Sequence, residues 1–238
     1  MNLVKASQEG DFDRVKLLLE SGVHPETTDE YTALFHASSR GHVEIVELLL
    51  EYGANVDSPG NDGETSLINA SHWGYTSIVK MLLEHDPDVD AADWNGVTAL
   101  MTTNVERHPT IAKLLLDAGA SVNQVDDEGN TALSHACQES CLANVKILLE
   151  HGADPDIVNH DGETALDMTY GFKKEVAILI EDAKKRNARR LINLWRVATR
   201  TWRITNFWWR IAGEGQHAPG GRGRKRSLAE FARDAVAN

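Results

Sequence analysis

A 33-residue period runs through most of this 238-residue chain and constrains its fold more than any other feature. Five successive segments carry a threonine at the same place, and a leucine follows two positions later in each: Thr32, Thr65, Thr98, Thr131 and Thr164, then Leu34, Leu67, Leu100, Leu133 and Leu166. Leu-Leu pairs at 49–50, 82–83, 115–116 and 148–149 keep the same step. Because independent positions share one period, the sequence predicts a stack of similar units.

Each unit has the pattern of a turn followed by two short helices. In the second unit, Thr32 is placed to cap a helix over 33–39 through its side-chain hydroxyl. Gly41 is placed to end that helix in the left-handed conformation, and a longer helix over 43–51 carries an apolar stripe of period 3.6 before Gly53. One such pair of helices cannot bury its own apolar faces, so the units must stack side by side.

Two stretches of the sequence resemble the ankyrin family, whose repeat carries G-x-T-P-L-H, then Gly-His, then an apolar pair before Gly-Ala. They are Gly129-Asn-Thr-Ala-Leu-Ser-His-Ala136 and Gly41-His42 through Gly53-Ala54. The resemblance covers about three quarters of the chain. It implies an all-α ankyrin-repeat solenoid of stacked helix-turn-helix units with β-hairpin-like finger loops. It also implies that His36 and His135, one position past the family's histidine, bond neighbouring backbone and tie repeats together.

We predict an ankyrin-repeat domain of about six units within residues 1–182. The first is a degenerate cap at 2–28, and the others span 29–61, 62–94, 95–127, 128–160 and 161–182. Residues 183–212 are predicted to form a basic, Trp-rich amphipathic helix. Residues 213–238 are predicted to form a Gly/Arg linker and a short C-terminal segment.

The fourth unit departs most from the common pattern. Arg107 replaces the glycine that ends the first helix elsewhere, and Pro109 follows it, which is tolerable only in the first turn of a helix. In the fifth unit Asn144 takes a position held by isoleucine in units two to four, so it must point outward or find a buried partner. We expect the middle of the stack to be its softest part.

No arrangement of residues indicates catalysis, and we expect no enzyme activity, cofactor or metal. The sequence lacks HExxH, GxSxG and the Walker pattern, and its carboxylates lie in turns and on exposed helix faces. Cys137 and Cys141, which would share a face on a single helix, form neither a disulfide framework nor a metal site. We interpret them as reduced thiols of an intracellular protein, cytoplasmic, nuclear or both.

The charge is divided between the two parts of the chain. Residues 1–182 hold 10 Lys and Arg against 33 Asp and Glu, and residues 183–238 hold 14 against 3. The acidic repeats favour a protein partner with a basic surface and argue against nucleic acid. The sequence has neither an apolar run of transmembrane length nor a secretory signal, and we expect a monomer.

The family binds other proteins through finger tips and short first helices that line a concave face, so the resemblance implies a non-catalytic interaction scaffold. Mapping those positions onto this chain gives thirteen candidate partner-binding residues: Tyr31, Arg40, His72, Trp73, Trp94, Asn95, Val97, Glu106, Asp127, Glu128, Asn130, Gln138 and Glu139. Trp73 and Trp94 stand out because tryptophan is enriched among interface hot spots. The alternative is that both tryptophans merely shield the irregular fourth unit.

The basic segment has apolar residues spaced 4, 3 and 4 apart and flanked by arginines. The candidate contact residues there are Trp195, Trp202, Trp208, Trp209, Arg196, Arg200 and Arg203. Three functions stay open: contact with an anionic membrane surface, binding to a helix acceptor of the calmodulin type, or capping of the repeat stack. A fourth possibility is disorder. The membrane interpretation makes a peripheral membrane scaffold the alternative function.

Overall fold

The structure is a computed structural model that describes residues 2–27, 31–105 and 107–213, apart from the side chains of residues 190, 191, 196–198 and 200–213. Contacts divide the chain into two units, Met1–Arg186 and Asn187–Asn238. Every named element in the described chain is a helix, which confirms the predicted all-α class. Antiparallel bridges from Ala92, Val125 and Val158 to the threonine six residues later give three finger loops their hairpin form.

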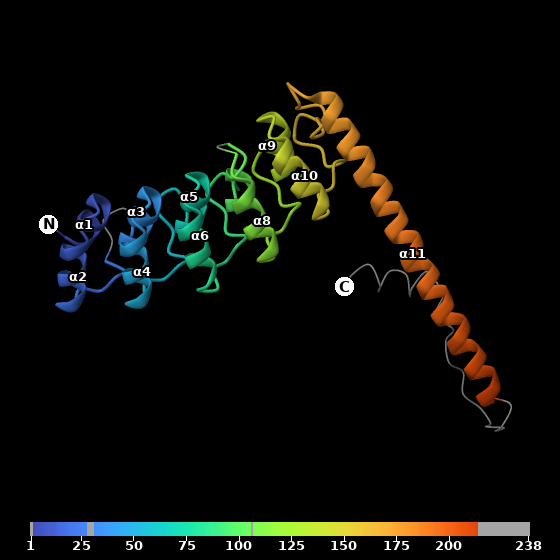
Figure 1. The fold of residues 1–238 in the computed structure, drawn as a ribbon, viewed down its shortest axis with the longest axis horizontal. Helices are drawn as coiled ribbons and strands as arrows, with labels where there is room; N and C mark the ends of the chain where they lie inside the picture. Colours follow the sequence, from blue (N-terminus) through green and yellow to red (C-terminus); the bar gives the residue numbers. More distant parts are fainter. Residues whose placement is uncertain (1, 28–30, 106, 214–238) are drawn as a thin grey trace. The chain divides into compact units, whose positions relative to one another are not determined.

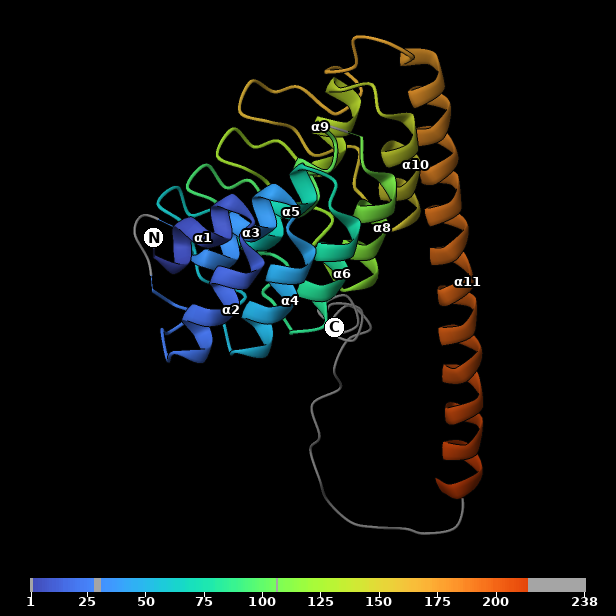
Figure 2. The ribbon, with the colours of Figure 1, turned by 60° about the vertical axis from the view of Figure 1, so that its left-hand side comes forward.

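The first unit is a row of helix pairs in chain order (Figure 1). The pairs are α1 (Leu3–Glu9) with α2 (Phe12–Glu20), α3 (Ala33–Arg40) with α4 (Val43–Glu51), α5 (Ser66–His72) with α6 (Thr76–Leu83), α7 (Ala99–Thr102) with α8 (Pro109–Asp117), and α9 (Ala132–Gln138) with α10 (Leu142–Glu150). The short first helices pack on one another along one row and the second helices along another. The finger loops fan out beside the first helices in Figure 2.

Local signals begin and end these helices as the sequence predicts. The hydroxyl oxygens of Thr32, Thr65 and Thr131 accept hydrogen bonds from backbone N–H groups three residues on, at 3.1, 3.3 and 3.2 Å. Gly41 ends α3 with a φ of 78°. Thr98 is the exception, because its side chain makes no capping hydrogen bond at the start of α7.

The core is one continuous cluster along the stack, built from the periodic apolar positions. Leu34, Leu67, Leu100 and Leu133 are all buried, and the second helices contribute Ile45, Ile78, Ile111, Leu49, Leu82, Leu115 and Leu148. Each such side chain stabilises the fold by about 1.5–3 kcal/mol when it is withdrawn from water. A lone hairpin would leave most of that surface wet, so stacking supplies the stability.

A series of hydrogen bonds joins the loops that follow the second helices of successive repeats. Asp57, Asp90 and Asn123, each 33 residues apart, accept a backbone N–H from the next repeat at 2.9, 2.7 and 2.8 Å. Asp156 continues the series at the end of the stack, where its carboxylate binds Lys184 Nζ at 2.6 Å. Lys184 therefore takes the place of a further repeat.

The sixth unit differs from the others because turns, not an α-helix, follow Thr164. The Asp167 carboxylate accepts hydrogen bonds from the hydroxyl and the backbone N–H of Thr164, at 2.6 and 3.1 Å. These bonds hold the pKa of Asp167 below its ordinary value and favour a turn over a helix. The second helix of the unit is the start of α11 (Lys173–Gly213), whose Val176, Ile180 and Ala183 are buried.

Candidate functional site

The finger tips are joined by a backbone ladder. The N–H groups of Trp94, Asp127 and His160, 33 residues apart, donate to the carbonyl oxygens of Asp62, Asn95 and Glu128 at 3.0, 2.9 and 2.9 Å. Each tip is therefore fixed against the previous one, and its side chains project from a shared edge. We call the exposed tip residues Asp62, Trp94, Asn95, Asp127 and Glu128 the finger row.

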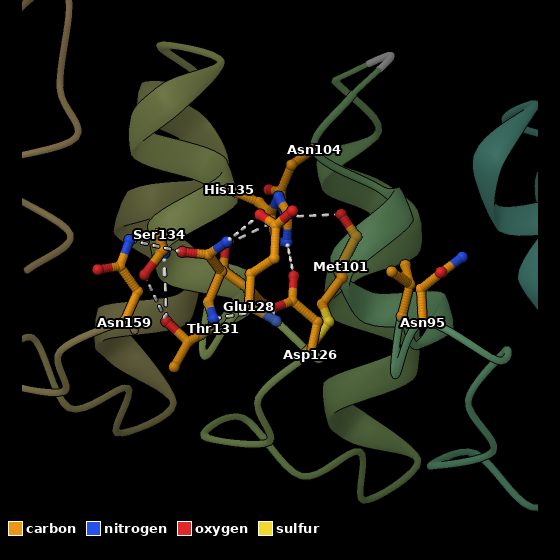
Figure 3. Close-up of polar contacts among 12 residues, drawn as sticks. Asn95, Met101, Asn104, Asp126, Glu128, Thr131, Ser134, His135 and Asn159 are labelled. Atoms are coloured by element: carbon orange, nitrogen blue, oxygen red, sulfur yellow. Dashed lines mark hydrogen bonds and ion pairs between the residues drawn. The ribbon is translucent and has the colours of Figure 1, made fainter. Parts of the chain in front are cut away.

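Carboxylates and amides at the finger bases shape these loops. Asp93, Asp126 and Asn159 each use Oδ1 to accept two N–H groups of their own loop, at 2.8–3.1 Å. The second oxygen of Asp126 lies 2.8 Å from Nε2 of His135 on α9 (Figure 3). The expectation that His135 bonds backbone is therefore wrong. Its ring bonds a carboxylate and braces the finger that leads into its own helix.

Two of the predicted contact residues belong to the structure of the fingers. Asn130 is only 3% exposed, and its side chain donates to Glu128 and accepts from Asn159 (Figure 3). Its assignment as a partner contact is wrong, because this side chain ties two fingers together. Val97 is half-buried and packs against the core. Periodicity placed both residues in fingers but did not show which way they face.

Trp94 is more exposed than Trp73, the other tryptophan of the predicted set within the repeats. Its indole is 74% exposed and lies over Gly63 of the preceding finger, where a methyl group would come within 2.7 Å of Cδ1. So exposed a ring does not shield the fourth unit. Tyr31 is half-buried, stacks on Phe35 at 4.4 Å between ring centroids, and donates its hydroxyl to Asp62.

A second group of residues lies where the first helices end. Seven side chains line an open hollow of ≈ 730 Å³: Gln8, Glu9, Ser39, Arg40, His42, Trp73 and Tyr75. They come from the ends of α1, α3 and α5 and the beginnings of α4 and α6. The hollow thus brings Arg40 and Trp73 together. The other five members are not among the thirteen predicted contact residues, because three different repeats contribute them.

Rings packed on glycines build the walls of this hollow. A methyl group on Gly10 would lie 2.6 Å from the His42 ring, and one on Gly41 would lie 2.6 Å from the Tyr75 ring. Both glycines have φ near 77°. The same contact occurs between Gly74 and the His108 ring. At these positions a glycine lets each repeat approach the next closely.

The predicted site therefore divides into two places. Trp94 lies at a finger tip before α7, whereas Trp73 follows the last residue of α5 at the other end of a first helix. His72 lies edge-on to Trp73, with ring centroids 4.9 Å apart. Gln138 and Glu139 are exposed at the end of α9, and Glu139 accepts a bond from Arg107 through its backbone oxygen. Glu106 lies outside the described residues.

A buried amide pair, found only in the structure, joins the fourth and fifth units. Asn144 donates to Oδ1 of Asn104 at 2.8 Å and to the backbone oxygen of Thr103 at 3.1 Å. Asn104 donates in turn to the carbonyl oxygens of Met101 and Ala132 (Figure 3). Asn144 thus has the buried partner that its position requires, and a chain segment ending α7 supplies it.

The two cysteines of the chain lie among the described residues. Cys137 lies in α9 and Cys141 precedes α10, so the two thiols do not lie on one helix, because α9 ends between them. Both are free and buried, and burial raises the pKa of Cys137 to about 11. No group of His, Cys, Asp and Glu that would hold a metal ion occurs among the described residues.

The basic helix is the continuation of α11. Trp195 is 69% exposed, and Ile192 and Leu194 are exposed as well. The side chains of Arg196, Arg200, Arg203, Trp202, Trp208 and Trp209 lie outside the description. Within residues 2–27, 31–105 and 107–213, no helix combines the length and the apolarity that crossing a bilayer requires.

Stacked helical hairpins with hairpin fingers define a helical-repeat solenoid. A family model for ankyrin repeats (three copies) matches residues 3–93, 88–159 and 107–189. The chain belongs to the ankyrin-repeat family, as the sequence resemblance predicted. Ankyrin repeats are in general protein–protein interaction modules without catalytic activity.

A solved structure of an ankyrin repeat domain from Acinetobacter baumannii is similar to this chain, with a TM-score of 0.71 and 28% identity. The match covers 76% of this chain and 97% of that one. An ankyrin repeat-containing protein of Schizosaccharomyces pombe is 37% identical over 65 residues, and ankyrin repeat domain-containing protein 39 of Homo sapiens is 42% identical over 55 residues.

In these two matches with curated relatives, the matched region is a short part of this chain and of the relative. They cover 26% and 22% of this chain and 31% and 30% of the two curated relatives. The 2-5A-dependent ribonuclease of Mus musculus is 42% identical over 57 residues, which cover 23% of this chain and only 8% of that enzyme.

Proposed function

We propose that this protein is a non-catalytic adaptor whose finger row and short first helices bind a protein partner with a basic surface. The observation that carries the proposal is Trp94, a large aromatic ring that is 74% exposed at a tip held by the finger ladder. A residue whose backbone is already fixed in place loses less conformational freedom on binding, which favours affinity.

The charge around Trp94 supports a basic partner. Asp62, Asp127 and Glu128 are exposed carboxylates of the finger row. In the described part of the chain, no lysine or arginine lies within ion-pair distance of any of them. Lysine or arginine side chains of a partner would pair with carboxylates that have no cationic partner within the described chain, and they would also be steered toward this surface at low salt.

The experiment is a capture comparison with the full chain as bait. One bait carries Trp94→Ala, Asp127→Asn and Glu128→Gln, and a matched control carries Tyr52→Ala, which removes an exposed aromatic ring at the end of α4. We expect the finger-row variant to lose most of the proteins captured by the wild type and the control to keep them. Unchanged capture by the finger-row variant would refute the assignment.

We also propose that the protein acts inside the cell, in the cytoplasm or the nucleus, as a monomer. Two free thiols in the core support a reducing compartment. Fluorescence microscopy of the tagged chain tests the location. Light scattering tests the mass, which should correspond to 26.3 kDa for one chain.

A second candidate function is a scaffold held at a membrane surface by the basic helix. The exposed Ile192, Leu194 and Trp195 support it, because apolar side chains on an arginine-rich helix insert at anionic bilayer surfaces. Sedimentation with phosphatidylserine-containing vesicles tests it on the full chain. A variant with Arg196, Arg200 and Arg203 changed to glutamate should stay in the supernatant. The absence of wild-type binding at low salt would remove this function.

A further inference from the structure

The hollow at the helix ends differs in charge from the rest of the repeats. Arg40 is exposed there, and no carboxylate of the described chain lies within ion-pair distance of its guanidinium. Glu9, the acidic residue of the hollow, lies 3.9 Å from Lys5 Nζ, so a cation already accompanies its charge. The hollow therefore presents an unpaired cation in a domain that holds 10 Lys and Arg against 33 Asp and Glu.

The hollow also has an apolar wall, to which Trp73 and Tyr75 contribute. Trp73 is 53% exposed, and the Tyr75 ring beside it lies over Gly41. His72 supports the indole from one edge. His42, packed on Gly10, forms the opposite wall. Because close backbone contacts hold these rings, the hollow exists before any ligand arrives, and a ligand is not required to order it.

We propose that this hollow is a second docking site, which takes an acidic segment of a protein partner. One carboxylate of the segment pairs with Arg40, and an adjacent aliphatic or aromatic side chain packs against Trp73 and Tyr75. The inference rests on the proposed function only in that the repeats bind proteins. It uses none of the finger-row residues, and it selects the opposite charge.

The chemistry of the walls favours a peptide over other anions. A guanidinium matches a carboxylate with two parallel hydrogen bonds, and Ser39 and Gln8 offer further polar groups at the rim. A polyanion such as nucleic acid would meet the repulsion of the acidic repeats, and a single arginine would not compensate for it. The presence of Glu9 disfavours a run of acidic residues, so we expect one carboxylate next to one apolar side chain.

A peptide selection on the immobilised full chain tests the proposal. A displayed library of random heptapeptides is selected in parallel on four baits: wild type, Arg40→Glu, Trp94→Ala and Lys80→Glu. Lys80 is an exposed cation on α6 outside the hollow, so its reversal makes the same change of charge elsewhere. The wild type, the Trp94 variant and the Lys80 variant should all enrich an Asp or Glu beside an apolar residue. The Arg40→Glu bait should enrich a Lys or Arg in its place.

Binding of the winning peptide is then measured by calorimetry. Trp73→Ala and Arg40→Glu should each weaken it about tenfold or more, and Lys80→Glu should change it less than twofold. The proposal is overturned if no peptide is enriched over bare resin, or if the same peptides bind the Arg40→Glu variant equally well. Peptides lost with Trp94→Ala alone would also overturn it, and they would instead support binding at the finger row.

Discussion

The third and fourth repeats fill equivalent positions of the stack with different chemistry. The third has the seven-residue helix α5, capped by Thr65, and Gly74 at the turn that follows. The fourth has the four-residue helix α7, whose Thr98 makes no capping bond, and Arg107 at the turn with a φ of 61°. Ser71 and Asn104 occupy the same position in the third and fourth repeats. The Ser71 side chain is buried without a hydrogen-bond partner, whereas the Asn104 side chain makes three hydrogen bonds.

The difference teaches that one backbone arrangement is stabilised in two ways. In the third repeat, apolar packing suffices, and a small side chain at position 71 lets neighbouring helices approach. In the fourth repeat, the larger Asn104 interrupts the first helix, and hydrogen bonds replace part of the packing. The buried network stabilises the fold although Asn144 Oδ1 accepts no hydrogen bond, and it depends on Asn104, because each further unbonded buried group is costly.

The sharpest test of this comparison removes the side chain at the same position in both repeats. Asn104→Ala should destabilise the protein by about 3 kcal/mol, because two carbonyl oxygens and Asn144 lose buried partners. Ser71→Ala should change the stability by no more than about 0.5 kcal/mol, because its hydroxyl has no partner to lose. Urea unfolding measures both.

A double substitution isolates the amide pair. Asn144→Ile restores the residue type of the earlier repeats, and in the Asn104→Ala background it removes the stranded amide. The double variant should therefore be more stable than Asn104→Ala alone, by about 1–2 kcal/mol. Additive losses would show that the pair does not act as a unit.

The turn glycine offers the next largest contrast. Gly74→Ala should cost about 2 kcal/mol, since a methyl group would lie 2.3 Å from the His108 ring at a φ of 78°. Gly53→Ala, at a φ of 82° with open space around it, is the matched control for the backbone strain alone and should cost about 1 kcal/mol. Equal losses of stability for the two variants in thermal unfolding would show that the contact between Gly74 and the His108 ring does not contribute.

Much of the repeated framework could be predicted because one physical requirement recurs in every unit. The threonines and leucines that recur every 33 residues predict a capped helix with a buried leucine. The structure confirms both at Thr32 and Leu34. The shorter α7 was not predictable from Thr98, which obeys the pattern yet makes no cap. We attribute the short α7 to Asn104, whose side chain bonds Asn144, a residue 40 positions later in the sequence.

Cys137, which occupies the position of Ser71 and Asn104 in the fifth repeat, gives a pH-dependent test. Burial raises its pKa to about 11 from the ordinary value of 9.0, so between these values the folded chain keeps a proton that the unfolded chain releases. Stability should therefore fall as the pH rises through this window, by about 2 kcal/mol near pH 10.5. Cys137→Ala should lack this part of the loss in urea titrations. Identical slopes for both proteins would contradict the burial effect.

The smallest effect is expected when glycine replaces Arg107 at the turn of the fourth repeat. Arg107→Gly should stabilise the protein by about 0.5 kcal/mol, because relief of a positive φ outweighs the loss of an exposed hydrogen bond to Glu139. Arg107→Ala keeps the strain and loses the bond, so it should destabilise slightly. A loss of stability in the glycine variant would show that the Arg107 bond matters more than the strain.

The surface was harder to predict than the framework. Periodicity placed Trp73 and Trp94 correctly beside the core rather than in it, but it grouped two residues that lie at opposite ends of first helices. Asn130 was assigned to the partner-binding surface by mapping the family's finger positions onto the chain, yet its amide is buried between fingers. The hollow escaped prediction because Glu9, Arg40 and Trp73 meet only when three repeats are stacked.

The central claim is that the longer, capped first helix holds the third repeat rigid, whereas the short, uncapped α7 leaves the fourth repeat easier to open even with its polar network. Native-state hydrogen exchange of the full chain tests it most directly. Backbone amides of α7 and its following turn, including those of Asn104 and His108, should exchange through openings about 2 kcal/mol easier than those of α5 and α9. Equal or stronger protection in α7 would contradict the claim.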